Sequence, residues 1–369
     1  DTICEANNRE GMMGLLGALF GGGKKKKPTI RTKVEIIEHQ HVAPDEPEPV
    51  EKRIKSLNPG PSGLYPHEIL MLHYAQGYKT SIQEFQGFWR YKYGVRDPKG
   101  VLTSLMQRGY LKTGGAPEAM RNAKMDALRD CCRQAGLSPS GKKDTLIERL
   151  VKSADASLLE ATFSDKYFAL TELGGKALDA EGYIPYIHLK PIDGLDIWNV
   201  GGIVNAGQSP FWRDAMWGYM NKESIGFASA GNYGLYANMR LRMSEFVEDE
   251  GRIKDALRLA VEVECIDLNG AVNGGAWAYV ADKIAPYKDS LVKSAPGIIK
   301  RIVKLAKQAD YNDERLDALI LEIASRRSTP VQVFTPEECV RIVHAEKEGN
   351  TALLGRLYSK AQKRLKGEA

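Results

Sequence analysis

The sequence predicts a mainly α-helical protein: a winged helix of mixed α and β structure that carries an inserted two-helix module, followed by an α-helical C-terminal domain of helical hairpins. Three observations predict this. Short stretches with helical apolar periodicity precede an extended segment, an amphipathic helix pair separates that segment from a second extended one, and almost every window after residue 195 has a helical period. The 369 residues, 43% of them hydrophobic, are enough for two or three domains with cores.

Residues 1–61 are expected to form a disordered or extended arm, because prolines recur in their second half. The apolar run Met12–Phe20 is too short to span a membrane, and Lys24–Lys27 follow it, whereas the positive charges of a signal peptide come first. This run is then either a frayed terminus or a weak anchor to a membrane surface or to a partner. The codons of Arg9–Gly11 could encode a purine-rich ribosome-binding site, so we expect translation to start at Met12 or Met13.

Three helices and a strand are expected in residues 62–113. They are a helix from Pro66 to Gly77, a helix at Ser81–Tyr93, a helix from Asp97 to Gly109 and a strand at Tyr110–Lys112. For the second helix, Ser81 is the expected N-cap and Glu84 completes a capping box. Three short helices followed by a strand is the order of a winged helix.

A winged helix needs a second strand, and the next strand-like run is Lys166–Thr171. The following residues, Glu172–Leu178, resemble the end of many bacterial winged helices. We therefore expect Gly114–Phe163 to be an insertion at the tip of the wing, with a module at 117–160 and the host domain formed by 62–113 and 164–190. Such an insertion is tolerated because loop-closure entropy grows only logarithmically with length.

The insertion contains two amphipathic helices. The first is expected at Asn122–Leu137, with Leu128 and Cys132 on its apolar face and Gly136 as its stop. After a turn at 138–143, the second is expected at Asp144–Lys152.

The string L-R-x-x-C-R-x-x-G-L-x-x-S-G-K-K-x-x-L-I-x-R-L, within residues 122–156, resembles the SAP motif, a two-helix DNA-binding module. The resemblance implies a small core formed by Leu128, Cys132, Leu137, Leu146 and Leu150. It also implies that the DNA-facing residues are Ser140, Gly141, Lys142, Lys143 and Arg149, with the basic face extended by Arg129 and Arg133.

Elementary chemistry agrees with that assignment. A turn that leads into a helix presents free N–H groups to a phosphate, and Gly141 lets the backbone approach. Lys142 and Lys143 supply charge for counterion release. Two alternatives remain open: the lysines can be a solvated turn, and SAP-type modules also mediate protein contacts.

The winged helix offers a second surface, on which Lys99 and Arg108 are the candidate DNA-binding residues. The third helix has few side chains that read base edges, only Thr103, Ser104 and Gln107, so phosphate-dominated binding of low sequence specificity is expected. The alternative is a winged helix used for packing or dimerisation.

The C-terminal region, residues 191–369, is expected to bind an unknown protein partner. The predicted helices form pairs: Tyr233–Asp249 with Arg252–Leu268, Gly297–Asp310 with Asp313–Arg326, and Pro336–Glu348 with Thr351–Lys366. The pairs lack a fixed period, so no repeat family is assigned.

Composition and motifs give no support for catalysis. The sequence contains no P-loop, no H-E-x-x-H and no G-x-S-x-G, and its histidines are not spaced as ligands, so we expect no enzyme activity, no metal and no cofactor. The 5 cysteines are scattered, as in a reduced cytoplasmic protein. A net charge of +5 means that any DNA contact must come from a local patch.

The arrangement as a whole resembles SAP-domain proteins of Gram-positive bacteria and their prophages. We therefore expect a cytoplasmic, DNA-binding accessory protein, associated with the nucleoid or with a phage, whose two surfaces grip the duplex backbone. The rival hypothesis is a protein-interaction scaffold, built on the helical C-terminal domain, with no role in nucleic-acid binding.

Overall fold

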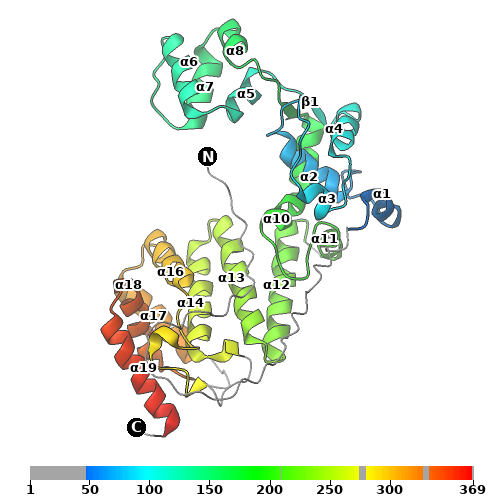
Figure 1. The fold of residues 1–369 in the computed structure, drawn as a ribbon. Helices are drawn as coiled ribbons and strands as arrows, with labels where there is room; N and C mark the ends of the chain where they lie inside the picture. The colour runs from blue at the N-terminus through cyan, green and yellow to red at the C-terminus, as the bar shows by residue number, and fades with distance from the viewer. Residues whose placement is uncertain (1–46, 208, 274–279, 327–331, 368–369) are drawn as a thin grey trace, which may run out of the picture. The chain divides into compact units, whose positions relative to one another are not determined.

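The computed structural model describes residues 47–207, 209–273, 280–326 and 332–367. Over these ranges the chain is mainly helical and has one two-stranded sheet, which confirms the expectation of a mainly α-helical protein (Figure 1). No helix in the same ranges is long and apolar enough to cross a membrane. Met12–Phe20, the lysines after it and the expected start of translation lie outside the described residues.

Short helices precede the sheet. They are α1 (Val50–Arg53), the 3-10 helix η1 (Ile54–Ser56), α2 (Pro66–Ala75), α3 (Phe88–Tyr91) and α4 (Pro98–Gln107). The third expected helix begins as predicted, because the Asp97 side chain accepts a hydrogen bond from the Gly100 amide at 2.8 Å. Gly109, with a φ of +81°, then leads the chain into the strand.

The two expected strands pair with each other. Strand β1 (Leu111–Thr113) runs antiparallel to β2 (Phe168–Leu170), with Leu111 opposite Leu170 and Thr113 opposite Phe168. Between the strands lie α5 (Ala116–Asn122), α6 (Met125–Gln134), α7 (Lys143–Ser153) and α8 (Ala156–Thr162), as Figure 1 shows. The two paired strands are therefore separated in the chain by four helices, in the region where the insertion is expected.

The inserted helices have a core of their own. Leu128, Cys132, Leu146 and Leu150 are fully buried, and Met120 from α5 and Phe163 after α8 join them. This cluster is separate from the larger core that extends through the rest of the described chain. Burial of this apolar surface gives the insertion its own source of stability.

The remaining elements are helical. They are α9 (Glu172–Ala180), α10 (Tyr183–Leu189), α11 (Val200–Ala206), α12 (Trp212–Ser229), α13 (Tyr233–Asp249), α14 (Ile253–Asn269), η2 (Ala271–Asn273), η3 (Tyr287–Asp289), α16 (Pro296–Gln308), α17 (Asp313–Ser325), α18 (Pro336–Glu348) and α19 (Thr351–Lys366). The six helices expected in this region are present, with α13, α18 and α19 matching to the residue. Gly251 and Gly349, both with positive φ, end α13 and α18.

The helix predicted at Ser81–Tyr93 is wrong over most of its length. Only Phe88–Tyr91 is helical, and Gly87 rather than Ser81 precedes it. The backbone just before this stretch is held by tertiary pairing: Lys79 forms a β-bridge with Tyr167, and the Thr80 amide donates to the Lys166 carbonyl at 2.8 Å. That pairing keeps the chain extended where the capping box would begin a helix.

Two further boundaries differ from the predictions. The arm expected to continue to residue 61 contains α1, because Pro49 occupies the N-cap, where its missing N–H removes no helical bond. In the module, Asn122 ends α5, and the first helix of the predicted pair starts at Met125, after extended backbone at Ala123 and Lys124.

A buried carboxyl group lies in the C-terminal helices. Glu264 on α14 is only 1% exposed, and Ser294 donates a hydrogen bond to its Oε1. Within the described chain its Oε2 and the nearby Tyr358 hydroxyl have no hydrogen-bond partner. Burial, with the Asp267 and Glu346 carboxylates adding to it, raises the pKa of Glu264 to about 8.

We predict that Glu264→Gln stabilises the protein at alkaline pH. The unfolded carboxyl ionises near 4.5 and the folded one near 8, so wild-type stability falls as pH rises through that window. A neutral amide removes this loss, which is on the order of 4 kcal/mol at pH 8. Thermal unfolding at acidic and alkaline pH measures the effect; equal sensitivity of both proteins to pH would contradict it.

The separate core predicts that the module can be excised. Gly114 donates to the Tyr167 carbonyl at 2.8 Å, so this pair can flank a two-residue turn. Replacing residues 115–166 by Asn-Gly gives a tight hairpin with the same register. We expect the shortened chain to keep its helical circular dichroism and to unfold cooperatively. A molten or insoluble product would show that the remainder depends on the module.

Candidate nucleic-acid interface

The turn between α6 and α7, residues Ser138–Lys143, is the candidate interface and is called the elbow below. Two glycines with positive φ shape it: Gly136, at +67°, ends α6, and Gly141, at +130°, lies within the elbow. The Leu137 amide donates to the Cys132 carbonyl at 2.7 Å, and the Leu137 side chain packs on the module core. The elbow is therefore anchored at its start by a packed helix end.

The two elbow lysines are open to solvent. Lys142 is exposed and Lys143 partly exposed, and neither ammonium group has an ion-pair partner among the residues that the structure describes. Asp144 and Glu148, the acidic residues of α7, are exposed as well, but neither forms an ion pair with the lysines. The elbow is thus neither buried nor masked by carboxylates.

The start of α7 adds hydrogen-bond donors to these charges. Lys142 is the N-cap residue and offers no side-chain acceptor, so the first amides of α7 lack a side-chain cap. The helix dipole favours an anion at this end. Thr145 lies beside Gly141, since a Cβ placed on that glycine would be 3.5 Å from the Thr145 Cβ. Sequence reasoning missed this exposed hydroxyl, although its place in the first turn of the helix was a usable signal.

Arg149 is directed at the elbow. Its Nη1 donates to the carbonyl oxygen of Ser140 at 3.0 Å and also to that of Ser138. The Ser138 and Ser140 hydroxyls lie 2.9 Å apart. These contacts place Arg149 with the candidate residues, although its guanidinium faces protein carbonyls.

The arginines of α6 are paired within their own helix. Arg129 forms an ion pair with Asp126 at 3.4 Å, and Arg133 pairs with Asp130. These i,i+3 pairs are exposed and contribute little to stability, but each offsets the positive charge of its arginine. The basic face expected on α6 is therefore weaker than the number of its arginines suggests.

The two candidates of the winged-helix surface, Lys99 on α4 and Arg108 at the C-cap of that helix, differ from each other. Lys99 is exposed, and its Nζ donates to Gln83 at 3.1 Å. Arg108 pairs with the largely buried Glu68, donates to the Gly63 carbonyl at 3.2 Å and lies over the Tyr110 ring. Arg108 is therefore engaged in contacts within its own domain. Its acidic partner, Glu68, is too distant in sequence for the pairing to be predicted.

We predict that Arg108→Met lowers the free energy of unfolding by about 1–3 kcal/mol, because Glu68 loses its charged partner in a nearly closed site. Methionine keeps an apolar stem over Tyr110. Lys99→Met is the control and changes stability by less than about 0.5 kcal/mol. Urea denaturation of the three proteins measures both effects; equal midpoints would contradict the structural role of Arg108.

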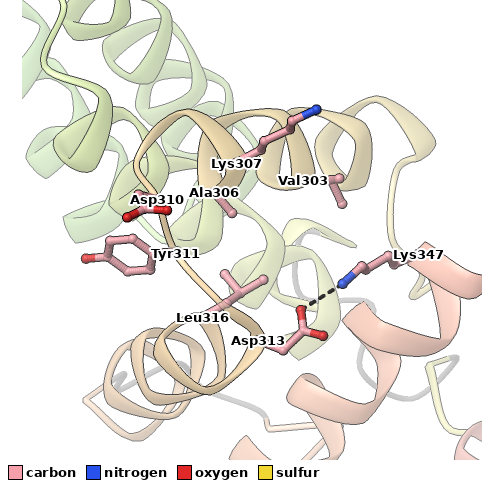
Figure 2. Close-up of a pocket in the computed structure, with 8 residues that line it drawn as sticks. All are labelled: Val303, Ala306, Lys307, Asp310, Tyr311, Asp313, Leu316 and Lys347. Carbon is pink, nitrogen blue, oxygen red and sulfur yellow. Dashed lines mark hydrogen bonds and ion pairs between the residues drawn. The ribbon is translucent and has the colours of Figure 1, made fainter.

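A second concave feature lies between α16, α17 and α18. Figure 2 shows its apolar side chains, among them Ala306 and Leu316, and the ion pair between Asp313 and Lys347, whose Oδ1 and Nζ are 2.7 Å apart. Across the described ranges no three histidine, cysteine or acidic side chains come together as metal ligands. The Asp313 and Lys347 charges at this hollow are paired with each other, so it offers a ligand less than the unpaired lysines of the elbow do.

Comparison with known proteins adds no relative. No protein-family model matches the chain, and no curated protein matches it. The argument for function therefore starts from the elbow and its geometry.

Proposed function

We propose that the protein is a DNA-binding accessory protein that contacts the phosphate backbone through the elbow. The observation that carries the proposal is the pair of the exposed Lys142 and the partly exposed Lys143, without ion-pair partners in the described chain, at the uncapped start of α7. Ammonium groups and free backbone amides at one place are suited to a phosphate oxygen. In this proposal the protein acts in the cytoplasm and is associated with nucleoid or phage DNA.

The packing around the elbow supports a SAP-type module. Leu128, Cys132, Leu146 and Leu150, which the resemblance places in the core, are fully buried, and Leu137 is partly buried against them. The elbow between the two helices is exposed, as a DNA-facing turn must be. Helices α2 to α4 followed by the β1–β2 pair likewise support a winged helix as the host.

Low sequence specificity follows from the chemistry of the surfaces. The Thr103 hydroxyl on α4 donates to the Lys99 carbonyl at 3.0 Å, and Arg108 is bound to Glu68, so few polar groups of α4 remain for base edges. The elbow lysines bind a phosphate as point charges, without the directional contacts that distinguish one base from another. Binding is therefore expected to depend on backbone charge more than on sequence.

The second candidate function is a protein-interaction scaffold without a role at nucleic acid. It is favoured by exposed apolar side chains at the C-terminal helices: Phe211, at the start of α12, is 68% exposed, and Ile225 on α12 is 57% exposed. In the leading proposal the same helices recruit a protein partner while the elbow holds DNA.

A salt series on the full-length chain tests the proposal. We expect duplex affinity to fall linearly with salt on logarithmic axes, with a slope set by the phosphates contacted. Reversing both elbow charges, Lys142→Glu with Lys143→Glu, should weaken binding at low salt by about tenfold or more and reduce the slope by about 2. Fluorescence anisotropy of a labelled duplex measures both quantities.

The matched control is Lys300→Glu with Lys307→Glu. These two lysines of α16 are also exposed and unpaired within the described ranges, so the net charge changes equally at a different place. The control should bind far more tightly than the elbow variant. Equal losses of duplex affinity in the two variants would show that only net charge matters. If the wild-type chain does not bind DNA at low salt, the protein-interaction scaffold is the remaining candidate.

A further inference from the structure

The contacts of Arg149 link the middle of α7 back to the elbow. One terminal nitrogen of its guanidinium donates to two backbone carbonyls, those of Ser138 and Ser140. These carbonyls come before Gly141, whose φ of +130° is open to glycine and strained for other residues. Arg149 therefore holds the part of the elbow that precedes its most adaptable residue.

Apart from this contact, the elbow is held at its two ends, where the Leu137 side chain packs on the module core and the Leu146 amide donates to the Lys142 carbonyl at 3.1 Å. The other interactions within it are the bond between the Ser138 and Ser140 hydroxyls and a long bond, 3.4 Å, from the Ser140 amide to the Ser138 hydroxyl. Both groups are exposed, where water competes for them. A charged donor shared by two carbonyls is the strongest restraint on the turn.

We propose that Arg149 is a positioning residue that braces the elbow and thereby fixes the direction in which Lys142, Lys143 and the first amides of α7 meet a phosphate strand. The inference rests on the proposed function and deepens it, since Arg149 acts through the turn, and the lysines make the contact. A pre-ordered turn loses less conformational entropy when it binds.

The test compares Arg149→Met with Lys152→Met in the full-length protein. Both changes remove one positive charge from α7 and keep an unbranched stem, but Lys152 is exposed and has no partner in the part of the chain that is described. Unchanged methyl resonances of Leu146 and Leu150 show that each module is folded.

The first readout needs no DNA. Backbone order parameters of Ser140, Gly141 and Lys142 should fall in Arg149→Met from about 0.85, the value of a rigid backbone, to below about 0.6. They should stay unchanged in Lys152→Met. An elbow that remains rigid without Arg149 overturns the proposal.

The second readout is the salt series. If Arg149 is a positioning residue, the Arg149→Met change should lower DNA affinity about tenfold and leave the salt slope unchanged. Loss of a direct phosphate contact would instead reduce the slope by about 0.9. A reduced slope, or full affinity despite a disordered elbow, overturns the proposal. If the wild-type chain binds no DNA while the order parameters fall as expected, the proposed function is wrong, but the role of Arg149 in ordering the elbow is supported.

Discussion

The antiparallel pairing of β1 with β2 is the constraint on which the N-terminal half depends. It joins segments on either side of the insertion, and the Thr171 amide adds a bond to the Tyr110 carbonyl at 3.1 Å. A Cβ on Gly174 would lie 2.1 Å from that same carbonyl oxygen, so only glycine allows α9 to approach β1 this closely. Because the pairing fixes both ends of the insertion, the module needs only a small core of its own to keep its helices together.

Much of the architecture could be predicted because its signals are local. The bounds of α13, α18 and α19 follow from features within a few residues of each helix end, such as the Thr335 cap before α18 and Gly349 after it. The elbow belongs to the same class. Its glycines, lysines and the uncapped start of α7 lie close together in the sequence, so the residue types alone indicated the candidate site.

The rest depended on contacts between distant residues. Ser81 and Glu84 have the spacing of a capping box, yet pairing of the preceding backbone with residues 166–167 prevents that helix from starting there. The bond from Arg108 to Glu68 crosses the domain in the same way and changes a candidate DNA contact into a structural ion pair. The pairing of Arg129 with Asp126 was different, since a spacing of three within a helix is visible in the sequence.

The distribution of ion pairs also limits how strongly the elbow can bind. Arg108, Arg129 and Arg133 have acidic partners within the chain, and Arg149 is bound to backbone carbonyls. Lys142 and Lys143 are therefore the candidates in the module whose charged groups have no partner among the described residues. Two phosphate contacts give a salt slope of about 2, so affinity from the elbow alone changes only about tenfold between 50 and 200 mM salt. Such a contact is weak by itself. The orientation of the elbow before binding then matters more, because a turn that is already ordered loses less conformational entropy when its lysines contact phosphates. In the proposed function, stable association with DNA requires a second tether. A partner held by the C-terminal helices would supply it by raising the effective concentration of the elbow near the duplex.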